Sequence, residues 1–137
     1  MRKAIFLILI ALGAISCESQ KKNTNEEPQS IAAQKNEAGE WDIEVLDTQY
    51  NYFLNAIARP KNMYTETFLK NRNRILVQEW NNYFYSGRYR NIIELPIDYD
   101  PKENYGLNFE YKLYQAFAYV TWRYKLKFSG LSNVDSY

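Results

Sequence analysis

The chain has 137 residues, enough for one domain, and its 17 basic and 16 acidic residues leave a net charge of +1. From Trp41 onward 12 basic and 11 acidic residues nearly cancel, so the composition offers no basic domain for nucleic acid. The absence of histidine and the single cysteine exclude Ser-His-Asp and Cys-His triads, histidine zinc sites and an internal disulfide.

The N-terminus has the pattern of an export signal. The first three residues give it a positive end, and the next thirteen, 4–16, carry no charged side chain. This run is shorter than the roughly 20 apolar residues of a spanning helix and fits the apolar region of a secretory signal. Ala-Ile-Ser-Cys at residues 14–17 resembles a bacterial lipobox, although its first position is more often leucine. We therefore predict a lipoprotein signal peptide over residues 1–16 and acylation of Cys17.

The alternative is a plain signal peptide and an incidental cysteine, because small residues at positions 14 and 16 also suit ordinary cleavage. If Cys17 carries two or more acyl chains, such as palmitate, they hold the mature protein stably at a membrane of the cell envelope. We then expect the membrane as one partner and an envelope protein as a second, with no nucleic acid.

Composition divides the rest of the chain into three parts. Residues 17–40 are the acylated cysteine and a disordered tether rich in Glu, Lys, Gln and Asn, which would span about 25–30 Å as a coil. Of the 23 aromatic residues, 22 lie from Trp41 onward, which is ample material for one core. We predict an aromatic-rich globular domain over residues 41–128 and a flexible tail over residues 129–137.

The domain is predicted to begin with a half-buried strand, because residues 41–45 alternate apolar and acidic side chains. A helix follows, capped by Asp47 or Thr48 and ended before Pro60. A second helix is predicted from its cap Thr65 to about residue 86, where apolar side chains recur at helical spacing and a glycine follows.

A second strand is predicted over residues 93–97, with Pro96 favouring an edge position. After a polar loop, Asn108 is expected to cap a third helix that runs to about Lys127. The predicted fold class is α+β: a small, helix-dominated domain in strand-helix-helix-strand-helix order, in which the two strands pair as a short two-stranded sheet.

The third predicted helix is apolar around most of its circumference. One stripe runs from Phe109 to Tyr124, and a second, on another face, includes Tyr111, Tyr114 and Trp122. A helix of this kind is usually buried at the centre of a domain, which is the simpler interpretation. Alternatively, the second stripe is a partner or ligand surface, since aromatic patches mark interfaces.

Acidic side chains are the remaining candidates for chemistry. Asp98, Asp100 and Glu103 share one loop, but calcium needs six to eight oxygens and Lys102 stands where another ligand would help, so a solvated turn is the simpler interpretation. Glu79 and Asp98 would suit glycoside hydrolysis if they were held about 5–9 Å apart.

The simpler interpretation of Glu79 is a structural ion pair with Arg59 or Arg72. We assign no catalytic residue, metal ligand or cofactor. The candidate polar site consists of Arg59, Glu79, Asp98 and Asp100. A separate set of basic residues has tyrosines 85 and 89 between its members and could form a basic patch. The simpler interpretation is that these residues lie on a solvated helix face and at a helix C-terminus. This set comprises Arg72, Arg74, Arg88 and Arg90.

Five short motifs follow one another over about residues 41–125. They are Ala58-Arg59-Pro60, Glu79-Trp80-Asn81, Ile97-Asp98-Tyr99-Asp100, Tyr105-Gly106 and the aromatic run from Phe109 to Tyr114. Their order and spacing resemble a family of small bacterial lipoproteins, a domain of unknown function seen in Bacteroidota. The chain departs from it at Ser86-Gly87, where a proline is expected. The resemblance implies the same signal, tether and compact domain, and it implies no activity.

Two classes of function remain. The first, which the sequence favours, is a non-enzymatic envelope module that binds a partner or helps an assembly, with the aromatic stripe as its contact surface. The second is a glycan-binding or weakly glycoside-hydrolysing domain, in which aromatic rings stack on sugars and Glu79 or Asp98 acts.

Overall fold

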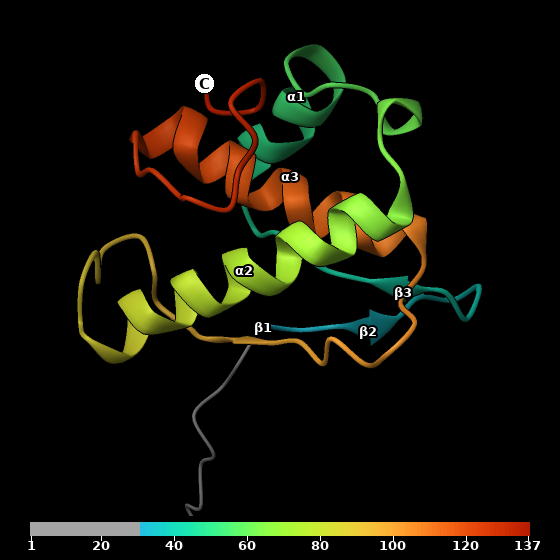
Figure 1. The fold of residues 1–137 in the computed structure, drawn as a ribbon, viewed down its shortest axis with the longest axis horizontal. Helices are drawn as coiled ribbons and strands as arrows, with labels where there is room; N and C mark the ends of the chain where they lie inside the picture. Colours follow the sequence, from blue (N-terminus) through green and yellow to red (C-terminus); the bar gives the residue numbers. More distant parts are fainter. Residues whose placement is uncertain (1–30) are drawn as a thin grey trace, which may run out of the picture.

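The computed structural model describes residues 31–137, in which three α-helices pack beside two pairs of short strands (Figure 1). In chain order the elements are β1 (Ile31–Ala32), β2 (Gln34–Lys35), β3 (Trp41–Asp42), α1 (Thr48–Ala56), the 3-10 turn η1 (Lys61–Met63), α2 (Glu66–Tyr85), β4 (Ile97–Asp98) and α3 (Leu107–Tyr124). From β3 onward the strand-helix-helix-strand-helix order confirms the predicted α+β fold. The signal peptide, Cys17 and most of the predicted tether lie outside the described residues.

Local sequence sets the start of each helix. The Asp47 carboxylate accepts a hydrogen bond of 2.9 Å from a backbone N–H in the first turn of α1, and the Thr65 hydroxyl caps α2 at 3.2 Å. The predicted cap of the third helix, Asn108, is wrong. Gly106, with φ at +84°, occupies the cap position of α3, and Asn108 lies in the first turn. A glycine suits that position because a side chain there would be strained.

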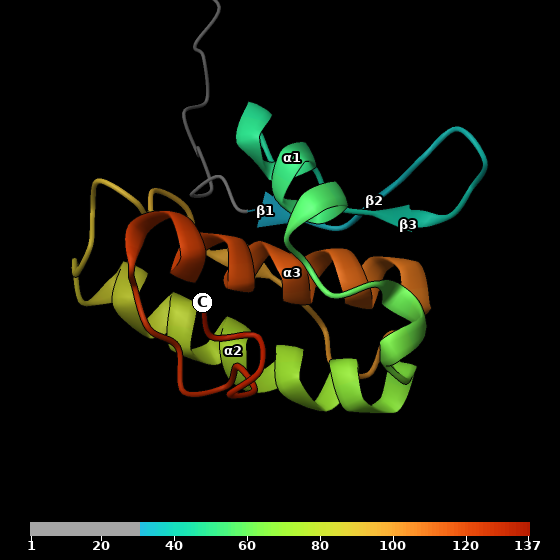
Figure 2. The same cartoon turned by 90° about the horizontal axis from the view of Figure 1, so that it is seen from above.

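Helices α2 and α3 form the centre of the domain and run side by side in the same direction (Figures 1 and 2). Asn73 hydrogen-bonds Glu110, and the ring of Trp80 packs edge-on against Phe117, so facing positions keep an offset of 37 residues (110 − 73 and 117 − 80). The C-terminal ends of both helices therefore meet at one end of the molecule. None of the helices found in residues 31–137 is long and apolar enough to cross a membrane.

The strands pair differently from the prediction. β1 is parallel to β4, with Ile31 opposite Ile97, and β2 is antiparallel to β3, with Lys35 opposite Trp41. The predicted pairing of the two domain strands with each other is therefore wrong, because each takes its partner from residues 31–35. Residues 31–35 therefore belong to the folded domain rather than to the tether, which corrects the predicted boundary at Trp41.

The last nine residues also belong to the domain, which overturns the predicted flexible tail. Leu131 and Asp135 are buried, and the ring of Tyr137 packs edge-on against Phe53 with 5.5 Å between centroids. Figure 2 shows this segment turning back along the helices after the end of α3. The C-terminal segment thus closes the core on the side of α1 and α2.

Gly130 gives a test of this packing. A Cβ at position 130 would lie 2.8 Å from Cγ of Leu76, a fully buried side chain of α2. We expect Gly130→Ala to lower the free energy of unfolding by about 1–2 kcal/mol, since overpacking outweighs the reduced entropy of the unfolded chain. Urea denaturation followed by tryptophan fluorescence measures the change. Asn133→Ala, an exposed position of the same segment, is the control, and equal stability of both variants would contradict the packing.

Candidate functional site

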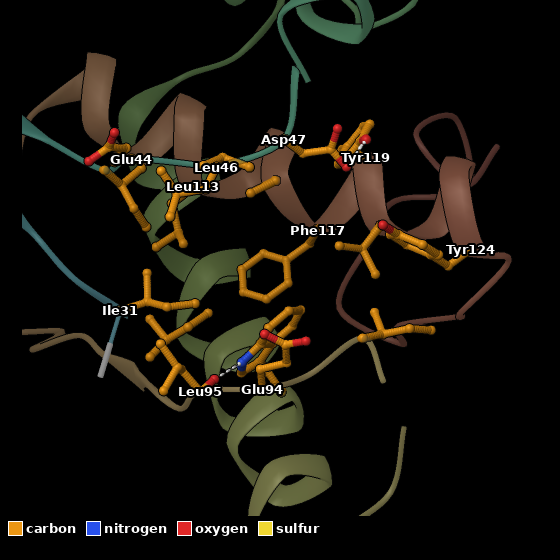
Figure 3. A pocket seen from close by; sticks show the side chains of 17 residues that line it. Ile31, Glu44, Leu46, Asp47, Glu94, Leu95, Leu113, Phe117, Tyr119 and Tyr124 are labelled. Carbon is orange, nitrogen blue, oxygen red and sulfur yellow. Dashed lines mark hydrogen bonds between the residues drawn. The ribbon is translucent and has the colours of Figure 1, made fainter. Parts of the chain in front are cut away.

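An apolar cavity of about 260 Å³ lies between α3, the segment before α1 and the segment before β4 (Figure 3). Its wall includes exposed side chains, so it reaches the surface. Phe117 stands in the middle of the view, with Leu113 and Leu46 on one side and Leu95 on the other. The lining residues are Ile31, Ile43, Glu44, Val45, Leu46, Asp47, Trp80, Ile92, Glu94, Leu95, Ile97, Leu113, Ala116, Phe117, Tyr119, Val120 and Tyr124.

The cavity wall is held by contacts between distant parts of the chain. The indole N–H of Trp80 donates to the carbonyl of Leu95 at 2.8 Å, which fixes the segment before β4 against α2. The Tyr119 hydroxyl donates to Asp47 at 2.5 Å, which fixes the segment before α1 against α3. The cavity is thus preformed, as small-molecule sites usually are, although it is slightly smaller than the 300–1,000 Å³ typical of drug-sized ligands.

The charged side chains that line the cavity are all acidic, and Arg123 is a cation near its edge, close enough to help lower the pKa of Asp47. Glu44, Asp47 and Glu94 are its ionisable carboxylates, and no Lys or Arg is among its lining residues. The hydrogen bond from Tyr119, followed by that from the Gln49 backbone, lowers the pKa of Asp47, so its carboxylate stays charged at neutral pH. The site therefore combines an apolar interior with a negative rim.

The aromatic stripe predicted as a contact surface is mostly buried. Tyr114 is fully buried and donates its hydroxyl to Asp135 at 2.9 Å, so its prediction as a surface residue is wrong. Tyr111 is half-buried and donates to the Arg59 carbonyl at 2.8 Å. Trp122 is half-buried, with its ring 5.5 Å from that of Phe53. The other interpretation, a central core helix, describes α3 correctly.

The proposed carboxylate pair is not formed. Glu79 accepts hydrogen bonds from the backbone and hydroxyl of Ser129 at 2.9 and 3.1 Å. Asn81, two residues later on α2, binds the backbone of Ile97 in β4, next to Asp98. Two residues correspond to about 200° around a helix, so Glu79 and β4 lie on opposite sides of α2. The partner of Glu79 is the C-terminal segment, which also corrects the expected ion pair with Arg59 or Arg72.

The other two members of the predicted polar site are also apart from these groups. Asp100 accepts a hydrogen bond of 2.9 Å from the backbone N–H of Lys102, which is the turn that its loop composition favours. Arg59 borders a different surface depression, next to Ser132 and Asp135. Within residues 31–137 no cluster of three or more His, Cys, Asp or Glu side chains forms a possible metal site.

The carboxylates of the cavity are not recognisable as a group from the sequence. Glu44 was assigned to the outer face of a strand, Asp47 only to a helix cap, and Glu94 to no role. Residues 44, 94 and 124 come from three separate segments, and only the fold brings them to one cavity. One feature of the sequence could have pointed to the site: Leu46 is a large apolar residue directly before the cap residue Asp47. In the structure the Leu46 side chain lies at the cavity and is 90% exposed.

A family of unknown function (DUF6146) matches residues 5–136 of the chain. No curated protein and no solved structure matches it. The match covers most of the signal-like segment, the polar stretch and all but the last residue of the folded domain, and it confirms the resemblance to a domain of unknown function.

Proposed function

The chain belongs to this family of unknown function (DUF6146), and we propose that it is an envelope lipoprotein of the kind found in Bacteroidota, with a non-enzymatic binding domain. Acyl chains on Cys17 hold the protein at a membrane. The domain binds a small apolar group in the cavity beside Phe117. The negative rim selects ligands whose exposed end is positively charged.

The observation that carries this proposal is the cavity itself. Its interior is formed by apolar side chains of α3 and of the segments before α1 and β4, while Glu44, Asp47 and Glu94 supply its charges. Burial of each methylene group contributes about 0.8 kcal/mol, and carboxylates at the rim attract a cation without requiring its full desolvation. An alkyl amine has both features.

Glycoside hydrolysis receives less support. A glycosidase needs two carboxyl groups on either side of the scissile bond, about 5–9 Å apart. Glu79 is bound to Ser129 on one side of α2, and Asp98 follows the strand on the other side. The carboxylates of the cavity surround an apolar interior, which does not suit a sugar.

Binding of octylamine tests the ligand class. The protein for this test carries Cys17→Ser, which removes the acylation site, and mass spectrometry first verifies that the signal segment has been removed by the ordinary cleavage that small residues at positions 14 and 16 allow. Isothermal titration calorimetry is expected to show binding of octylamine but weak or no binding of octanoate. Affinity should rise about fourfold for each methylene from butylamine upward until the cavity is full, as expected for about 0.8 kcal/mol per group.

Ala116→Phe places a ring in the cavity and is expected to abolish octylamine binding, because Ala116 lines the cavity wall. Ala56→Phe puts the same side chain at an exposed position of α1 and serves as the control. The double variant Glu44→Gln, Glu94→Gln should retain the dependence on alkyl length and lose the preference for the amine. Equal binding of octylamine and octanoate by the unsubstituted cavity would reject the cationic ligand class.

Mass spectrometry of the protein from the membrane fraction tests the anchor. The expected mature chain starts at Cys17 and carries acyl chains, and Cys17→Ser should move the protein to the soluble fraction. A mature chain that retains its first sixteen residues, or starts without any acyl group, would contradict the anchor and leave the cavity proposal unaffected.

A further inference from the structure

The end of the domain where α2 and α3 terminate carries exposed arginine, lysine and tyrosine side chains. We name it the basic end. Its five cations are exposed, and they come from the loop after α2 and from the end of α3. Its members are Tyr85, Arg88, Tyr89, Arg90, Arg123, Tyr124, Lys125 and Lys127. Figure 1 shows these two segments at the same end of the molecule. This follows from the contacts between α2 and α3, Asn73 with Glu110 and Trp80 with Phe117, which make the two helices run in the same direction.

The tyrosines of the basic end are exposed rather than buried in the core. Tyr85 is 72% exposed, Tyr124 is 44% exposed and Tyr89 is 40% exposed, whereas most other aromatic residues of the domain are buried or half-buried. The guanidinium of Arg88 lies 5.1 Å from the ring centre of Tyr83 and 5.3 Å from that of Tyr89. These two rings, which lie edge-on to each other, hold the arginine in place at the surface without neutralising its charge.

Few carboxylates oppose these cations. Glu94 and Asp47, at the cavity, are the acidic residues beside this end, and Asp47 is engaged by Tyr119. Glu79 is engaged by Ser129. These hydrogen bonds leave the carboxylates charged, and Glu79 also accepts from the Tyr83 hydroxyl, against whose ring Arg88 packs. Five cations against three carboxylates leave an excess of about two positive charges. The opposite end has no such excess, since Glu66 begins α2 there and acidic residues 98, 100 and 103 precede α3.

Ile31, the first residue that the structure describes, lies across the cavity from Tyr124 of the basic end (Figure 3). The backbone N–H of Ile31 donates to the Pro96 carbonyl at 2.7 Å, and Ile31 lines the same cavity as Ile92 and Tyr124. Only 13 residues separate Cys17 from Ile31, so a fully extended connection reaches at most about 45 Å. An anchor on Cys17 therefore keeps the basic end within reach of the lipid headgroups.

We infer that the basic end is a lipid-contacting surface that binds anionic phospholipid headgroups and orients the domain on the bilayer. This inference rests on the proposed membrane anchor and specifies which face of the domain meets the membrane. Arginine and lysine near an anionic surface each strengthen binding, and tyrosine side chains place their amphipathic rings at headgroup level. The negative rim of the cavity lies at the border of this surface, which brings it close to membrane-bound cationic ligands.

Cosedimentation with vesicles tests the surface independently of acylation. The Cys17→Ser chain is mixed with vesicles of 30% phosphatidylglycerol in phosphatidylcholine, or of phosphatidylcholine alone, in low salt. We expect at least tenfold stronger binding to the anionic vesicles and its loss in 0.5 M NaCl, where screening is nearly complete. Equal binding to both kinds of vesicle, or binding to neither, would overturn the inference.

Substitutions then locate the contact. Arg88→Gln with Arg90→Gln is expected to weaken binding to anionic vesicles about 30-fold, at roughly fivefold for each arginine. Arg123→Gln alone should weaken it about fivefold, which keeps the test valid if the double variant fails to fold. Lys102→Gln removes an exposed cation from the loop before α3, at the other end, and should leave binding unchanged. An equal loss with Lys102→Gln would mean that net charge alone matters and would reject an oriented surface.

These results separate the two proposals. If the acylated protein is found by mass spectrometry but the Cys17→Ser chain ignores anionic vesicles, the anchor stands and the orienting surface is wrong. If no acylation is found and the vesicle binding depends on Arg88 and Arg90, the surface stands and the anchor is wrong. Retrieval of a protein partner through the basic end without vesicle binding would reject lipid as its ligand.

Discussion

Asp135→Ala is expected to lower the free energy of unfolding by about 3–5 kcal/mol, a large part of the stability of a domain of this size. The Asp135 carboxylate is fully buried and accepts three hydroxyl hydrogen bonds, from Tyr64 at 2.7 Å, Tyr114 at 2.9 Å and Ser132 at 2.6 Å. Alanine would leave these donors without their acceptor and would detach the C-terminal segment from η1 and α3.

Urea denaturation measures this loss, and two variants make it specific. Asp135→Asn retains an acceptor oxygen and should cost less than alanine. Val134→Ala changes the neighbouring side chain, which is 63% exposed, and should stay within about 0.5 kcal/mol of the natural chain. If Asp135→Ala were as stable as Val134→Ala, the C-terminal segment would contribute nothing to the fold and the original prediction of a tail would be restored.

Glu110 gives the second large effect. It is fully buried on α3, where its carboxylate accepts hydrogen bonds from Asn73 at 2.7 Å and from the Tyr99 hydroxyl at 3.1 Å. We expect Glu110→Ala to lower the free energy of unfolding by about 2–4 kcal/mol, because it leaves both donors unsatisfied and opens a cavity between the two central helices. The same denaturation measurement at pH 7 checks this loss.

Glu110 also makes stability depend on pH. Burial raises the pKa of the Glu110 carboxyl above its ordinary value of 4.5, against the smaller effects of the hydrogen bonds from Asn73 and Tyr99. A carboxyl with a raised folded-state pKa contributes stability that is fully present below the unfolded-state pKa and is lost as pH rises through the folded-state pKa. This contribution therefore declines from about pH 4.5 upward.

Glu110→Gln isolates this pH effect. Glutamine has nearly the same shape and no charge, and its amide N–H can donate to Oδ1 of Asn73, which has no hydrogen-bond partner within residues 31–137. The difference in unfolding free energy, variant minus natural chain, is expected to increase between pH 5 and pH 8. A difference that stays constant over this range would show that Glu110 does not titrate in the folded protein as its burial requires.

The helices could be predicted because their signals are local. Asp47 and Thr65 cap α1 and α2 through hydrogen bonds to backbone N–H groups two and three residues away, and apolar spacing identified each buried face. The central position of α3 followed from its apolar circumference. The choice between core and contact surface for its aromatic stripe required the structure, since Tyr114 suits both environments until Asp135 is placed beside it.

The candidate site could not be predicted, for a physical reason. Strands of two residues carry too few side chains to specify their partners, so the sequence assigned β3 and β4 to each other. The hydrogen bonds that position the cavity wall and the C-terminal segment join residues far apart in the chain. Tyr119 and Asp47 are 72 residues apart, and Tyr64 and Asp135 are 71 apart. No local pattern records such pairings.

The sequence alone thus determined the three helices, their order with the two domain strands, and the polar character of residues 18–30, because caps, periodicity and composition act over a few residues. The tertiary structure decided which strands pair, that residues 129–137 close the core, and that Glu44, Asp47 and Glu94 meet at one apolar cavity. These features depend on close packing between segments that are distant in the chain. Such contacts contribute to the free energy of folding only when the whole domain has assembled, so no local pattern of the sequence reveals them.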